Sequence, residues 1–181
     1  MLKKILIALA AIIAVFLIVV ALQPSEFHVE RTATMAAAPA TVFDQVNDFH
    51  KWDAWSPWAK LDPNAKIAFE GPPSGTGTIM TWAGNNQVGE GKMTLTESRP
   101  NELVKINVDI VKPMEGSSTS EFAFKPEGDQ TAVTWSMSGH QNFIAKAMCL
   151  VMNGKKMIGD DMEKGLAQLK SVAETGKSAS N

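Results

Sequence analysis

The sequence predicts an α+β protein of the helix-grip type, in which a curved antiparallel sheet of about seven strands wraps around a long carboxy-terminal helix. One transmembrane helix is expected before this domain. Three observations lead to the prediction: the chain opens with an uninterrupted apolar run, apolar residues then recur with a period of two over residues 66–139, and a helical period follows. The 181 residues are enough for one ordinary domain beside the apolar run.

The apolar run from Ile5 to Leu22 contains no charged or polar side chain. It would form about 27 Å of helix, and a bilayer core needs roughly 17–25 such residues, so residues 1–23 are expected to be a single-pass anchor. Lys3 and Lys4 precede the run and acidic residues follow it. This places the domain on the extracytoplasmic, periplasmic side of the inner membrane. A cleaved signal peptide is the alternative, but the run is long and the following VALQPS is a poor cleavage site.

The rest of the chain is acidic. Two of the 17 basic residues and none of the 19 acidic ones lie in residues 1–23, which leaves 15 basic and 19 acidic residues and a net charge of −4. This balance argues against nucleic acid as a partner and against electrostatic docking on anionic lipid. Cys149 is the only cysteine, so no intramolecular disulfide can form. Residues 24–176 are expected to fold as one domain, with residues 177–181 as a disordered tail.

The expected order of elements is one strand, two short helices, six strands and a long helix. Residues 27–35 alternate like a strand, and a helical stripe begins at Pro39, which suits a first helical position. Ser56 and Pro57 look like a helix cap and first-turn pair, so residues 58–61 are expected to form a second helical turn.

From Lys66 to Gly139 the apolar residues alternate between turn signals, which predicts six antiparallel strands. The last helix then has one apolar face over more than three turns. Its members are Ile158, Met162, Leu166 and Leu169.

The stretches DFHKWDAWSPW, GTGTIMTWAGNNQVGEGKMTLTESRPNE, TAVTWSMSG and IGDDMEKGLAQLK, in this order and spacing, resemble the polyketide cyclase/dehydrase and lipid-transport branch of the START-like (SRPBCC) superfamily. The resemblance runs from about Glu26 to Glu174. It implies a deep apolar cavity between sheet and helix that holds a hydrophobic small molecule. The superfamily includes lipid carriers, aromatase/cyclases and hormone receptors, so the fold leaves the function open.

Aromatic and methionine side chains are the candidates for the wall of such a cavity. Three of the five tryptophans lie within residues 52–58; Trp52 continues the first helix and is assigned to the core, whereas its two neighbours are expected at the cavity mouth. Methionine adapts to irregular space, so strand faces that combine it with tryptophan suit a pocket, although ordinary core packing is the alternative. The expected ligand-binding residues are Trp55, Trp58, Met80, Trp82, Phe122, Trp135, Met137 and Met162.

The almost wholly apolar stretch from Phe143 to Met152 contains one charge, Lys146. It is expected to be a buried helical turn against the sheet, a lid over the cavity, or a patch that touches the bilayer.

Signals for catalysis are weak. The sequence has no nucleophile elbow, phosphate-binding loop or metalloprotease motif. His28, His50 and His140 are isolated in the sequence, so neither a metal site nor a cofactor is expected and no catalytic residue is assigned. Glu90, between two glycines, is the one carboxylate considered for proton transfer, although a turn residue in solvent is the favoured alternative.

Three functions fit these observations. The preferred one is a membrane-anchored module that binds or transports an apolar, lipid-like small molecule. The second is a cyclase-type enzyme, which would need an acid or base within hydrogen-bond reach of its substrate. The third is an anchored protein-interaction domain with a vestigial cavity and an unknown protein partner. The missing catalytic constellation favours the first and third over the second.

Overall fold

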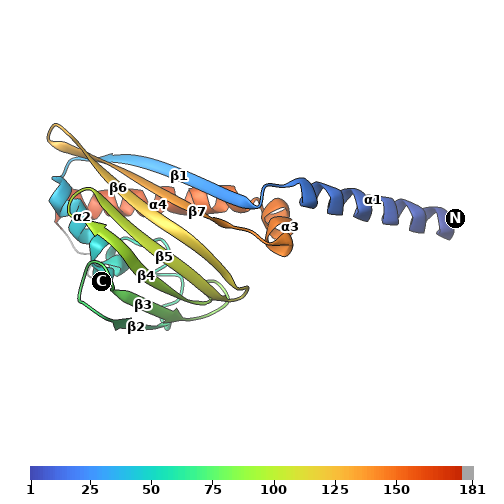
Figure 1. Ribbon diagram of the computed structural model, residues 1–181, viewed down its shortest axis with the longest axis horizontal. Helices are drawn as coiled ribbons and strands as arrows, with labels where there is room; N and C mark the ends of the chain where they lie inside the picture. Colours follow the sequence, from blue (N-terminus) through green and yellow to red (C-terminus); the bar gives the residue numbers. More distant parts are fainter. Residues whose placement is uncertain (177–181) are drawn as a thin grey trace.

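The computed structural model describes residues 1–176, so the predicted tail at residues 177–181 lies outside the described range. Within that range, α1 (Leu2–Leu22) projects away from a domain that contains one seven-stranded antiparallel sheet (Figure 1). The predicted α+β helix-grip fold is confirmed. α1 is long and apolar enough to cross a membrane, and its side chains are exposed except for Val20.

The sheet has the strand order β1-β7-β6-β5-β4-β3-β2, so every neighbouring pair except β1 and β7 is also consecutive in the chain. Glu26 at the start of β1 pairs with His140 at the end of β7, which brings the end of α1 beside the start of α3. The strands are β1 (Glu26–Met35), β2 (Lys66–Glu70), β3 (Ile79–Ala83), β4 (Glu90–Arg99), β5 (Leu103–Lys112), β6 (Gly116–Glu127) and β7 (Gln130–His140).

The helices of the domain are α2 (Pro39–Asn47), the 3₁₀ helix η1 (Phe49–Ala54), α3 (Phe143–Met152) and α4 (Gly154–Thr175). Figure 1 shows α4 running along the sheet behind β1 and β7. Of its predicted apolar face, Met162, Leu166 and Leu169 are buried there and Ile158 is half-buried. A glycine allows the close approach: a Cβ atom on Gly165 would lie 2.7 Å from the Trp135 ring and 3.0 Å from the Pro57 ring.

The predicted second helical turn at residues 58–61 is wrong in its position. The short helix is η1, which ends before that segment, and residues 58–61 form only turns. The Asp48 side chain caps η1 by accepting a hydrogen bond from the backbone N–H of His50. Asp48 therefore takes the capping role that the sequence pattern gave to Ser56.

The apolar stretch from Phe143 to Met152 forms a helix of its own. Its first turn is capped by Asn142, whose side chain accepts a hydrogen bond from the N–H of Ala145 at 2.9 Å. α3 ends where Asn153 adopts a left-handed conformation, and α4 begins at the next residue. α3 lies at the same end of the sheet as α1 (Figure 1).

Candidate ligand cavity

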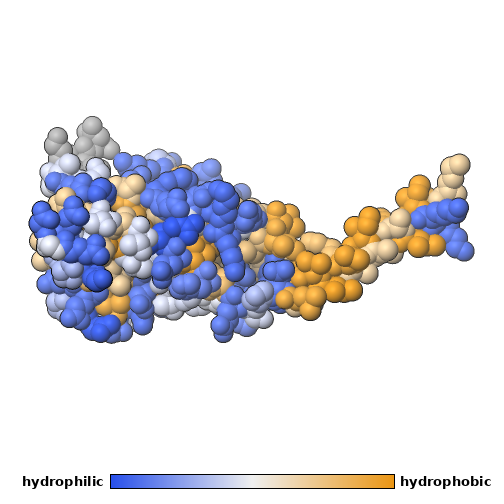
Figure 2. Space-filling model, turned by 90° about the horizontal axis from the view of Figure 1, so that it is seen from above, coloured by the Kyte–Doolittle hydropathy of each residue, from blue (hydrophilic) through white to orange (hydrophobic). Residues whose placement is uncertain are grey.

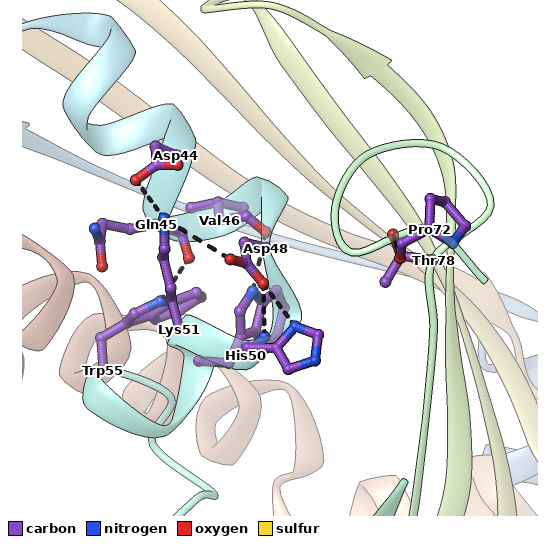
Figure 3. Close-up of polar contacts among 10 residues, drawn as sticks. Asp44, Gln45, Val46, Asp48, His50, Lys51, Trp55, Pro72 and Thr78 are labelled. Atoms are coloured by element: carbon purple, nitrogen blue, oxygen red, sulfur yellow. Dashed lines mark hydrogen bonds and ion pairs between the residues drawn. The ribbon is translucent and has the colours of Figure 1, made fainter. Parts of the chain in front are cut away.

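The end of α2 and the two tryptophans that follow it form one locked unit. The last four carbonyls of a helix have no partner inside it. Here Trp52 Nε1 donates to the carbonyl of Val46 at 2.9 Å, and Trp55 Nε1 donates to the carbonyl of Gln45 at 3.0 Å (Figure 3). The tryptophans therefore satisfy the helix end, and their own buried N–H groups are paired at the same time.

A 3₁₀ helix has about three residues per turn, so side chains three apart lie on one side of it. Trp52 and the C-cap residue Trp55 are three apart, and their rings lie 4.6 Å from each other. Trp55 packs on into the sheet with its ring 6.1 Å from that of Trp135, which in turn stacks on Phe122 at 4.7 Å. This aromatic cluster closes one side of the domain's interior.

A cavity of about 360 Å³ lies between this unit and the inner face of the sheet. Two cross-strand rows form much of its wall. Phe69, Met80, Met93 and Val108 are successive partners across β2 to β5, and Ile67, Trp82, Gly91 and Ile110 form the next row. All of these residues except Gly91 line the cavity. The remaining apolar lining comes from Phe49, Trp52, Trp58, Ala59, Ala65, Val88, Trp135 and Met137.

Gly91 determines where the Trp82 ring can lie. A Cβ atom on Gly91 would collide with the indole of Trp82, its partner on the adjacent strand. The Trp82 Nε1 donates to the carbonyl of Val88 at 3.0 Å, which fixes the ring across the space that the glycine leaves. Gly91 therefore shapes the cavity only indirectly, by leaving room for the Trp82 ring that lines it.

Trp58 differs from the other four tryptophans, all of which donate a hydrogen bond from Nε1. Trp135 Nε1, for example, donates to Ser120 Oγ at 2.8 Å. Among the described residues no such bond is made by Trp58, which is half-buried in the turns after η1. Its ring meets Trp135 edge to face at 5.8 Å. Trp58 is thus the least constrained ring in the cavity wall.

Trp58 also borders a second hollow of about 260 Å³. This hollow lies between α3, α4 and the turns after η1. It is lined by Trp58, Met148, Cys149, Met152, Gly154, Met157, Ile158 and Asp161. Trp58 therefore separates the main cavity from a second hollow whose wall is rich in methionine.

Few polar side chains reach the main cavity. They are His50, Asp53, Ser56, Asp62, Gln87 and Ser120. The oxygens of Asp62 accept hydrogen bonds from the backbone N–H groups of Asn64 and Asn85, so this carboxylate organises loops.

His50 is the one histidine that lines the cavity. Its ring stacks on Phe69 with 4.0 Å between centroids, and its Nδ1 lies 2.9 Å from Asp48 Oδ1 (Figure 3). Two other candidates lie outside the cavity. His28 Nε2 is 3.7 Å from Glu30 Oε2, and Glu90 accepts a hydrogen bond from Lys112. Residues 1–176 contain no group of three His, Cys, Asp or Glu residues that could hold a metal ion.

Five of the eight residues predicted to bind ligand lie on the cavity wall, namely Trp58, Met80, Trp82, Trp135 and Met137. Trp55, Phe122 and Met162 are fully buried in the core and are absent from the wall. Trp52 lies in the core, as expected, and its ring also borders the cavity, whereas Trp55 packs behind it and does not reach the cavity mouth. The sequence reasoning missed the β2 residues Ile67 and Phe69, although their alternation gave the signal.

Comparison with solved structures gives the same fold. KanY matches with 16% identity and a TM-score of 0.62 over 83% of this chain and 99% of that one. The Aha1 dimer from Colwellia psychrerythraea matches with 16% identity and a TM-score of 0.60, over 83% and 98% of the two chains. The di-domain ARO/CYC StfQ from the steffimycin biosynthetic pathway matches with 10% identity and a TM-score of 0.59, over 82% of this chain and 50% of that one.

No curated protein matches the chain. The family described as polyketide cyclase / dehydrase and lipid transport matches residues 26–174, which is nearly the whole domain after α1. This match agrees with the resemblance found in the sequence motifs and with the cavity beneath the curved sheet. The chain therefore belongs to the polyketide cyclase/dehydrase and lipid transport family.

Proposed function

We propose that the protein binds or carries an apolar small molecule in the main cavity, on the extracytoplasmic side of the membrane in which α1 anchors it. The observation that carries the proposal is the cavity itself, about 360 Å³ of space walled mainly by aromatic and aliphatic side chains. Small-molecule sites are concave, mostly apolar and roughly 300–1,000 Å³ in volume, with a few polar groups that fix orientation. This cavity is at the small end of that range.

The polar groups on the wall narrow the ligand class. Ser120 already accepts the Trp135 N–H and is buried, so its hydroxyl proton is available to a ligand oxygen. Gln87 offers an amide at another point of the wall. A compact, mainly hydrocarbon or aromatic molecule with one or two oxygen atoms fits this arrangement, such as a fused-ring compound or one end of a lipid.

The anchor supports a location at the membrane. α1 is about 32 Å long at 1.5 Å per residue, close to the thickness of a bilayer's hydrocarbon core. Lys3 and Lys4 favour a cytoplasmic amino terminus. We expect a reporter fused after Asn181 that works only in the cytoplasm to be silent, and the mature protein to retain α1. Activity of that reporter, or a mature chain that starts near Gln23, would contradict the anchored topology.

A cyclase-type enzyme is the second candidate, and His50 favours it. When His50 Nδ1 donates its proton to Asp48, the ring's Nε2 becomes an acceptor at the cavity wall. A base in that position could remove a proton from a bound substrate. Among the described residues that line the cavity, no second acid or base is paired with another ionisable side chain as His50 is with Asp48. Binding without turnover therefore remains the preferred function.

The deciding experiment is native mass spectrometry of the full chain extracted from its own membranes. A co-purifying apolar small molecule supports the binding function, and a chain that is always empty favours the third possibility, an interaction domain with a vestigial cavity. His50→Ala then separates carrier from enzyme. A carrier yields a molecule of the same mass in this variant, even where the smaller side chain on the wall lowers the amount bound, whereas an enzyme accumulates a substrate whose mass differs from that of the product.

A further inference from the structure

The outer face of α3 is apolar and uncovered. A helix on a protein surface that faces water normally has polar residues on its outer side. α3 departs strongly from that pattern, because six of its large apolar residues are exposed. The exposed residues are Phe143, Ile144, Met148, Leu150, Val151 and Met152. The exposed Met157 continues the face into α4.

This face is joined to the end of α1. The Lys146 side chain is buried, and its Nζ donates to the carbonyl of Gln23 at 3.0 Å and to that of Ala21 at 3.4 Å. These carbonyls belong to the negative, unsatisfied end of α1, which a cation stabilises. Val20, the one buried residue of α1, lies in the same last turn. α3 is therefore fixed at the level where α1 ends.

The position of α3 relative to a bilayer follows from these hydrogen bonds between Lys146 and the end of α1. If α1 crosses the hydrocarbon core from its first to its last turn, its end lies at the membrane surface, and α3 lies there too. Figure 2 shows one hydrophobic surface that continues from α1 onto the adjoining end of the domain. Lys155, which is exposed, follows shortly after α3 and can reach lipid phosphates, whereas Lys156 is paired with Asp160.

We propose that α3 is an interfacial helix whose apolar face lies in the outer surface of the bilayer that α1 spans. The proposal rests on the anchored topology above. It also gives the second hollow a role. Met148 and Met152 of α3 and Met157 of α4 line that hollow, which opens beside the embedded face and is separated from the main cavity by Trp58. An apolar ligand can then pass between lipid and cavity without crossing water.

The test uses the full chain in vesicles of phosphatidylethanolamine and phosphatidylglycerol. In a Cys149→Ser background, an environment-sensitive fluorophore is attached at Ile144→Cys or, separately, at Val151→Cys. The matched control is Asp129→Cys, because the exposed Asp129 lies in the turn at the opposite end of β7. We expect blue-shifted emission at both α3 positions and its loss when the lipids carry a nitroxide high in the acyl chain. The control label should show neither effect.

Three other results would overturn the proposal. Labels on α3 that report water, in vesicles that still float together with the protein, refute the interfacial helix and leave the anchor intact. Labels that are blue-shifted but insensitive to the lipid nitroxide show that a second copy of the chain covers α3. Failure of the protein to float with the vesicles refutes the anchor and with it the interfacial helix, whereas binding in the cavity is decided separately by the native mass spectrometry.

Discussion

Replacing Trp58 by alanine should weaken ligand binding far more than it weakens the fold. Trp58 has no indole hydrogen bond among the described residues and has hollow space on two sides. An indole buries roughly 150–250 Å² when fully covered, so one face covers about 100 Å² of a ligand. At about 25 cal/mol per Å² the loss is about 2.5 kcal/mol, or roughly seventyfold in Kd.

Trp55 provides the matched control, since it has the same side chain three positions earlier in the chain. It is fully buried, donates to the Gln45 carbonyl and packs against two sheet aromatics. Trp55→Ala should therefore cost about 3–5 kcal/mol of unfolding free energy, which is typical of a buried large-to-small replacement. Trp58→Ala should cost less than half of that.

The assay uses residues 24–181 without α1, with folding checked by circular dichroism. Urea unfolding gives the free energies, and titration with the apolar fluorophore N-phenyl-1-naphthylamine gives the affinities. Equal destabilisation by both variants, together with unchanged probe affinity in Trp58→Ala, would refute the role of Trp58 as a cavity wall.

Three further predictions concern other parts of the molecule. Gly91→Ala forces the Trp82 ring out of its place, so it should lower the unfolding free energy by about 1–3 kcal/mol and reduce probe affinity; unchanged affinity would contradict the role given to this glycine. The hydrogen bond from Lys170 lowers the pKa of the exposed Glu174 below its usual value of 4.5. A carboxyl group whose pKa is lower in the folded state stabilises the fold at pH values above its unfolded-state pKa, and this stabilisation is lost as the pH falls through the folded-state pKa. Glu174→Gln should therefore lower the urea midpoint at neutral pH and match the wild type in strong acid. Lys146→Met removes the bonds to the end of α1, so a protease should cut the linker after α1 faster in the full chain, and an unchanged rate would show that other contacts hold the joint.

Most of the sheet side of the cavity could be predicted from the sequence, because a strand has a strict period of two. Alternation alone places Met80 with Trp82, and Trp135 with Met137, on shared strand faces, and in the structure all four residues lie on the cavity wall. The pattern could not separate cavity wall from core. Phe122 is the cross-strand partner of Trp135 and faces the same way, yet the η1 tryptophans cover it.

The placement of Trp55 behind Trp52 has a similar cause. Their positions depend on a 3₁₀ helix, in which side chains three residues apart are eclipsed, whereas in a continued α-helix they would lie about 60° apart around the axis. Which rings reach the α2 carbonyls is decided by the backbone path after Asn47. The bonds from Lys146 to α1 span more than 120 positions in the chain, so no local pattern could reveal them.

The connection between α1 and β1 contains only Gln23, Pro24 and Ser25. Three residues extend to about 10 Å at most, which is less than the length of the domain's own strands. With α1 in the bilayer, the domain could diffuse sideways within the membrane plane but could not travel across a water-filled compartment. A molecule it carried would have to be handed to an acceptor at that same surface, and delivery would depend on how often the two meet in two dimensions.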